Sequence, residues 1–180
     1  MNKRAPTPNT QMTMAEAFRA IAASRPEREA LICRPLEASG SPKAGGIVRL
    51  TYGQLLEGIE ALARGLWSLG MRKGDKVAVL MSPGPDFVYA FFAIAQLGAV
   101  FVPLSPQVRR RGLSAVLQDA EPVALITSRP VEQQVLNTAG TLRHVLSANK
   151  EVGRPNLADL MADAGPSSVR PSSVTYVDDG

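Results

Sequence analysis

Helical and apolar strand-like segments alternate along residues 51–127, and this order constrains the fold more than any other feature of the sequence. The run at 77–81 is too uniformly apolar for a half-exposed strand, which indicates a central strand covered on both faces. Alternation of this kind predicts an α/β fold with a largely parallel sheet, joined by right-handed helical crossovers. The predicted order is helix (from 51 to about 69), strand (77–81), helix (86–97), strand (99–104, also buried), helix (109–120) and strand (123–127).

The segment before residue 51 predicts a small N-terminal unit. Residues 1–11 are polar and proline-rich, as expected of a flexible arm. Thr13 and Glu16 have the spacing of a capping box, and the apolar side chains behind them follow at helical intervals. We therefore expect a helix with apolar residues at helical intervals, then a hairpin of strands at 30–33 and 47–50 around a surface loop at 35–46. These apolar residues are Met14, Phe18, Ile21 and Ala22.

The helix that begins at Thr51 also carries a capping box, with Gln54 three residues later. An apolar stripe on this helix is expected to face the core, and Gly70 is expected to end the helix. The stripe comprises Leu55, Ile59, Leu62, Ala63, Leu66 and Trp67.

The signal is weaker beyond residue 127. Helical pieces are expected at 130–139 and 156–164 and strands at 143–147 and 174–177. A sheet that lacks its next neighbour leaves an unpaired edge, so we expect self-association through the exposed sheet edge or partial disorder beyond about residue 130.

Composition excludes several classes of protein. The net charge is +4, but the basic residues are not interleaved with aromatic ones, so a nucleic-acid partner is not expected. The stretch 87–104 is long and apolar, yet Gly98 and Pro103 interrupt it, which favours a helix, a turn and a strand over a transmembrane segment. No secretory signal is visible, and a cytoplasmic location is expected.

The single cysteine and the single histidine offer little chemistry. One cysteine forms no internal disulfide, and one residue of each kind does not make a zinc site. Cys33 lies in an apolar run and is expected to be a buried, inert thiol, because a catalytic thiol would need His144 as its partner. His144 is expected to be a structural strand residue. We therefore predict no catalytic residue and no metal ligand in the chain.

Four segments in order resemble the adenylate-forming (AMP-binding) superfamily, which includes acyl-CoA synthetases, fatty acyl-AMP ligases, luciferases and peptide-synthetase adenylation domains. The resemblance covers residues 12–130 well and the remainder loosely. The residues that carry it are scaffold residues such as helix caps and turn glycines. The four segments are Leu50-Thr51-Tyr52-Gly53-Gln54-Leu55, Gly70 through Val79, Pro85 through Leu104, and Leu113 through Ile126.

The resemblance implies a ligase that uses ATP and Mg²⁺ to convert a carboxylic acid into acyl-AMP, then passes the acyl group to coenzyme A or a carrier thiol. It also implies a phosphate-binding loop that would begin near Asp178, Asp179 and Gly180. Two carboxylates there would repel phosphate. Three explanations stay open: the alignment to the family's loop is shifted, the loop of this chain diverges from the family pattern, or the sequence is cut before the loop. Asp178 and Asp179 could also bind a metal ion as a pair, but a terminus exposed to solvent is the favoured interpretation. Residues 12–180 are then the N-terminal α/β subdomain, truncated before that loop and inactive alone.

Two motifs bear on the substrate. The segment 82–87 with Ala90-Phe91-Phe92 resembles fatty acyl-AMP ligases, whereas the short loop at 105–110 is more like acyl-CoA or olefin β-lactone synthetases. A fatty acid is therefore the preferred substrate class.

Two other hypotheses remain. One is a stand-alone α/β binding or interaction module that kept the scaffold without catalysis. The other is an unrelated doubly wound nucleotide domain, which is disfavoured because no G-x-G-x-x-G follows the strand at 77–81.

Overall fold

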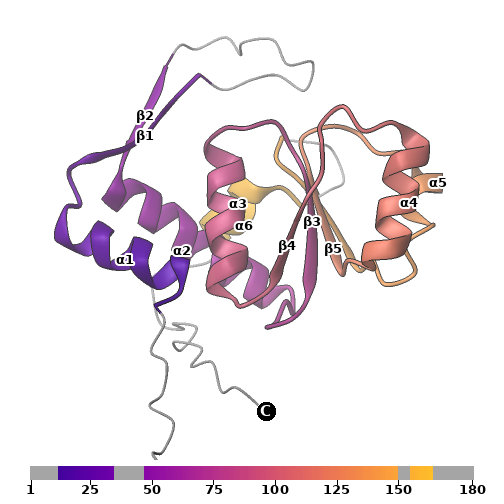
Figure 1. The fold of residues 1–180 in the computed structure, drawn as a ribbon, viewed down its shortest axis with the longest axis horizontal. Helices are drawn as coiled ribbons and strands as arrows, with labels where there is room; N and C mark the ends of the chain where they lie inside the picture. The colour runs from indigo at the N-terminus through magenta and orange to yellow at the C-terminus, as the bar shows by residue number, and fades with distance from the viewer. Residues whose placement is uncertain (1–11, 35–46, 150–154, 164–180) are drawn as a thin grey trace, which may run out of the picture.

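The computed structural model describes residues 12–34, 47–149 and 155–163, and its N-terminal part is a helix followed by a hairpin (Figure 1). Helix α1 (Met14–Ser24) begins at the predicted capping box, in which the Thr13 hydroxyl accepts from the Glu16 N–H at 3.2 Å. Strand β1 (Glu29–Cys33) pairs antiparallel with β2 (Val48–Thr51), which confirms the predicted hairpin. The arm at 1–11 and the loop at 35–46 lie outside the described residues.

The apolar residues predicted at helical intervals lie on α1, but they are only partly buried. Ala22 is buried, but Met14 and Ile21 are 58% and 45% exposed. Phe18 is half-buried against other aromatic rings. Helical spacing correctly places these side chains on one face; it does not determine whether another element covers that face.

Helix α2 (Tyr52–Ser68) starts at the second capping box, where the Thr51 hydroxyl accepts from the Gln54 N–H at 3.3 Å. Its apolar stripe is buried as predicted, with the exception of Trp67, which is 37% exposed. Trp67 lies instead against the guanidinium of Arg72, 3.7 Å from the ring centroid. Gly70 follows the helix with a φ of +88°, a backbone angle that favours glycine and ends the helix as expected.

The central sheet has four parallel strands in the order β4-β3-β5-β6. Strand β3 (Lys76–Leu80) has a neighbour on each side, and its last four residues are fully buried, as the apolar run predicts. Strand β4 (Val100–Pro103) lies at one edge with Val100 46% exposed, so the expectation of a buried strand there is wrong. The remaining strands are β5 (Ala124–Thr127) and β6 (His144–Ser147).

Helices cover both faces of the sheet, as Figure 1 shows. Helix α2, α3 (Pro85–Gln96) and α6 (Leu157–Asp163) pack on one face, and α4 (Arg110–Ala120) and α5 (Gln133–Leu136) pack on the other. The first face buries side chains such as Leu62, Leu66, Ile94 and Leu157, and the second buries Leu113, Leu117 and Val135. The molecule is therefore a three-layer α/β unit with a hairpin attached, as the sequence predicts.

Two close helix contacts on the first face depend on glycine. A Cβ at Gly58 in α2 would lie 2.5 Å from the Tyr89 ring of α3. A Cβ at Gly65 would lie 2.9 Å from the backbone oxygen of Leu160 in α6. These two positions allow α2 to approach both neighbours closely, which seals the core between the helices and the sheet.

The region beyond residue 130 contributes to the core. Leu146 in β6 is fully buried and Leu157 in α6 is almost so. The expected partial disorder therefore does not hold for 131–149 and 155–163, whereas the strand predicted at 174–177 lies outside the described residues. Within the described residues, no helix combines the length and apolarity that crossing a membrane requires.

Candidate functional site

The carboxyl ends of the four parallel strands meet at one edge of the sheet and form the candidate site. Successive crossovers place β4 on one side of β3 and β5 on the other, so the chain changes direction between β3 and β5. Ligands of open parallel sheets bind at the carboxyl edge beside such a switch point. The polar residues that directly follow or closely follow these strands are Ser82, Ser105, Ser128, Arg129 and Asn149.

Hydrogen bonds connect the loops at this edge to one another. The Asn149 side-chain amide donates to the Ser128 carbonyl at 2.7 Å, and the Ser128 N–H donates to the Leu80 carbonyl at 3.1 Å. The Arg129 guanidinium donates to the Val108 carbonyl at 2.8 Å, which links the loop after β5 to the loop before α4. Intramolecular hydrogen bonds thus connect the loops after β4, β5 and β6 at the carboxyl edge.

Arg129 lies at this edge with a buried side-chain nitrogen, which sequence reasoning did not predict. Its Nε is buried, and it is the one buried side-chain nitrogen or oxygen without a hydrogen-bond partner among the described residues. A buried unpaired donor costs about 1–3 kcal/mol. The only cue in the sequence is its position two residues after a buried parallel strand, where ligands commonly bind.

Three consecutive arginines begin α4 at the same edge. Arg110 pairs with Glu132 at 3.2 Å and donates to the Gln134 side chain. Arg109 and Arg111 are exposed and make no ion pair within the described part of the chain. The carboxyl edge therefore carries net positive charge, which attracts anions but performs no chemistry by itself.

The described residues gather neither a metal-ligating cluster nor a cysteine–histidine pair. No group of three or more His, Cys, Asp or Glu side chains among them is arranged to hold a metal ion. Cys33 lies in the hairpin and His144 in β6, so the two residues belong to different sheets and are not brought together as a nucleophile and its base. Cys33 is half-buried rather than buried, because its strand has no layer packed over both faces.

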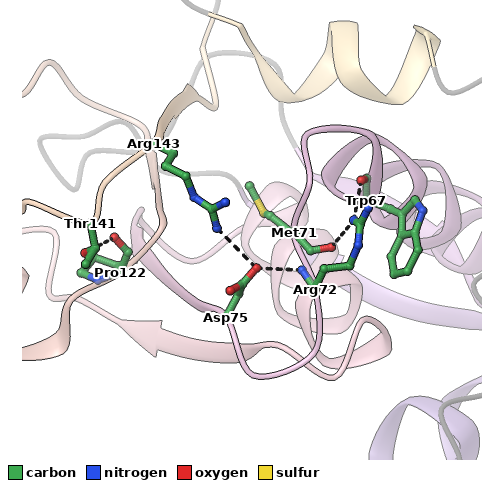
Figure 2. A network of polar contacts seen from close by, with 7 residues as sticks. All are labelled: Trp67, Met71, Arg72, Asp75, Pro122, Thr141 and Arg143. Atoms are coloured by element: carbon green, nitrogen blue, oxygen red, sulfur yellow. Dashed lines mark hydrogen bonds and ion pairs between the residues drawn. The ribbon is translucent and has the colours of Figure 1, made fainter.

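The opposite edge of the sheet carries a polar network of structural character (Figure 2). The Asp75 carboxylate accepts from the Arg72 N–H at 2.8 Å and lies 3.7 Å from the Arg143 guanidinium. The Arg72 guanidinium donates to the carbonyls of Trp67 and Met71 at 2.9 and 2.8 Å. These contacts stabilise the turn between α2 and β3. The Gly74-Asp75 turn in the second of the four resembling segments therefore has a structural role.

The pKa values of Tyr89 and Glu16 are displaced from their ordinary values, and both shifts have structural causes. Burial raises the pKa of the Tyr89 hydroxyl, and the charge of Asp86 raises it further. Hydrogen bonds from the Thr13 backbone and side chain lower the pKa of Glu16. Neither group faces the carboxyl edge of the sheet in a way that suggests acid–base catalysis: Tyr89 packs against α2, and Glu16 caps α1.

The residues expected to begin a phosphate loop, Asp178, Asp179 and Gly180, lie outside the described residues. The structure therefore leaves their role as a prediction.

Comparison with known proteins gives a consistent assignment. The model of the AMP-binding enzyme family matches residues 18–176. A crotonobetaine/carnitine–CoA ligase of Escherichia coli is 35% identical over 122 residues, which are 66% of this chain and 22% of that protein. A putative long-chain-fatty-acid CoA ligase from Rhodopseudomonas palustris has a TM-score of 0.69 and 26% identity, and the match covers 84% of this chain and 36% of the other.

A long-chain-fatty-acid-CoA ligase from Archaeoglobus fulgidus shares the fold with a TM-score of 0.71 at 23% identity, covering 90% of this chain and 32% of the other. The chain thus spans between 22% and 36% of the length of these three relatives.

Proposed function

This chain belongs to the AMP-binding enzyme family, and from that premise we propose that it is the N-terminal portion of an ATP-dependent acid–CoA ligase. In the proposed reaction a carboxylate oxygen attacks the α-phosphorus of ATP, forming acyl-AMP and releasing pyrophosphate. The thiol sulfur of coenzyme A or a carrier then attacks the acyl carbonyl carbon, and AMP leaves as the thioester forms. The observation that carries this proposal is the family match over residues 18–176.

We propose that Mg²⁺ accompanies ATP, since this ion binds through phosphate oxygens and a few protein carboxylates. Catalysis of the first step would rest on positioning and on neutralising the charge of the triphosphate. The positive carboxyl edge of the sheet, with Arg109, Arg111 and Arg129, is compatible with an anionic substrate nearby. The parent protein is proposed to act in the cytoplasm.

A fatty acid is the substrate class that we favour. The segment 82–87 and the Ala90-Phe91-Phe92 triplet support it through their likeness to fatty acyl-AMP ligases. The similarity to the Rhodopseudomonas palustris protein, described as a putative long-chain-fatty-acid CoA ligase, points the same way. The Escherichia coli relative acts on crotonobetaine or carnitine according to its name, so a small polar acid is the competitor to test.

The 180-residue chain alone is expected to catalyse no acid-dependent exchange of labelled pyrophosphate into ATP. The reason is that the chain spans only 22% of the length of the Escherichia coli ligase. The measurement is exchange by the purified chain with a panel of fatty acids, crotonobetaine and carnitine. The full-length Escherichia coli ligase serves as the positive control, and acid-dependent exchange by the short chain would contradict the prediction.

The function itself is tested on the longest product of the reading frame that encodes this chain. If the frame continues into a Gly/Ser/Thr-rich loop that ends in lysine, the product should exchange pyrophosphate with fatty acids and then form a CoA thioester. Absence of exchange with every acid in the panel would overturn the proposed function. Exchange with carnitine or crotonobetaine alone would overturn only the substrate class. A stop codon directly after Gly180 would instead favour the stand-alone module.

A further inference from the structure

We draw no further inference here: the strongest candidate, the surface patch of half-buried phenylalanine rings that runs from Phe18 of α1 over Phe92 and Phe91 of α3 to Phe101 of β4, carries no proposal because nothing in the structure shows what covers it.

Discussion

At the scale of single residues, glycines decide how closely the helices pack. Gly65 is buried in α2 where the backbone of Leu160 passes, and an added Cβ would meet its carbonyl oxygen at 2.9 Å. A carbonyl oxygen in a helix is part of the backbone and does not move aside as a flexible side chain does. The contact between α2 and α6 therefore requires the absence of a side chain at this position.

Gly65→Val is expected to lower the free energy of unfolding by about 2 kcal/mol, because it overpacks the contact between α2 and α6. Urea unfolding followed by circular dichroism measures the change. Gly140→Val is the control, since a Cβ at Gly140 meets no atom within 4 Å. The control should change stability by no more than about 0.5 kcal/mol. Equal destabilisation by both variants would show that close packing is not the cause.

At the scale of elements, the start of α1 depends on a carboxylate. Glu16 accepts from the Thr13 N–H at 2.8 Å and from its hydroxyl at 2.9 Å, and its pKa is lowered by these hydrogen bonds. A lowered pKa in the folded state means that the carboxylate form stabilises the fold. This contribution is complete above the unfolded value of 4.5 and is lost as the pH falls through the lower folded value.

Glu16→Gln is expected to make stability less dependent on pH in the acid range. The melting temperature of the wild type should fall as the pH is lowered from neutral to below 4.5. The melting temperature of the variant should fall less, because its amide does not titrate. Thermal melts at a series of pH values provide the measurement. If the two proteins show the same pH profile, the Glu16 cap does not contribute to acid sensitivity.

The sequence predicts the helices and strands better than it predicts which of their side chains are buried. Capping boxes at Thr13 and Thr51 marked two helix starts correctly, because they are local hydrogen-bond patterns. The order of helices and strands from 51 to 127 follows from helical periodicity, short apolar runs and the capping and turn residues between them. Errors arose where burial depends on distant neighbours. Trp67 lies on the expected helix yet pairs with Arg72 at the surface, and β4 is apolar yet lies at an edge.

The candidate site was less predictable than the fold. Parallel strands end at one edge, so the position of Ser82 or Ser128 at that edge could be inferred from strand order. The buried Nε of Arg129 and its partner at Val108 depend on loop conformations that carry no periodic signal. The residues expected to contact ATP, near Asp178, Asp179 and Gly180, lie outside the described part of the chain.

At the scale of the whole molecule, stability is unevenly distributed. Strands β3 and β5 have neighbours on both sides and helices over both faces, and their side chains are almost entirely buried. The hairpin of β1 and β2 has two strands, half-exposed side chains and contacts mainly with α2. An isolated two-stranded hairpin is marginal in water, so this part should open first.

Native-state hydrogen exchange is expected to show this gradient. Amides of β3 and β5 should exchange slowest, at a rate set by global unfolding, and amides of β1 and β2 should exchange fastest among the strands. Mass spectrometry of peptic fragments resolves these segments. Equal protection of the hairpin and the central strands would mean that the whole chain unfolds as one cooperative unit.

The central place of β3 has a consequence during synthesis on the ribosome. In the sheet Leu80 lies opposite Thr127, so β3 gains its second neighbour only when a segment nearly fifty positions later has emerged. At about 5–20 residues per second, the most apolar strand of the chain waits roughly 2–10 s for that neighbour. During this interval the nascent chain presents a half-covered apolar strand, which makes it a substrate for chaperones that bind such segments.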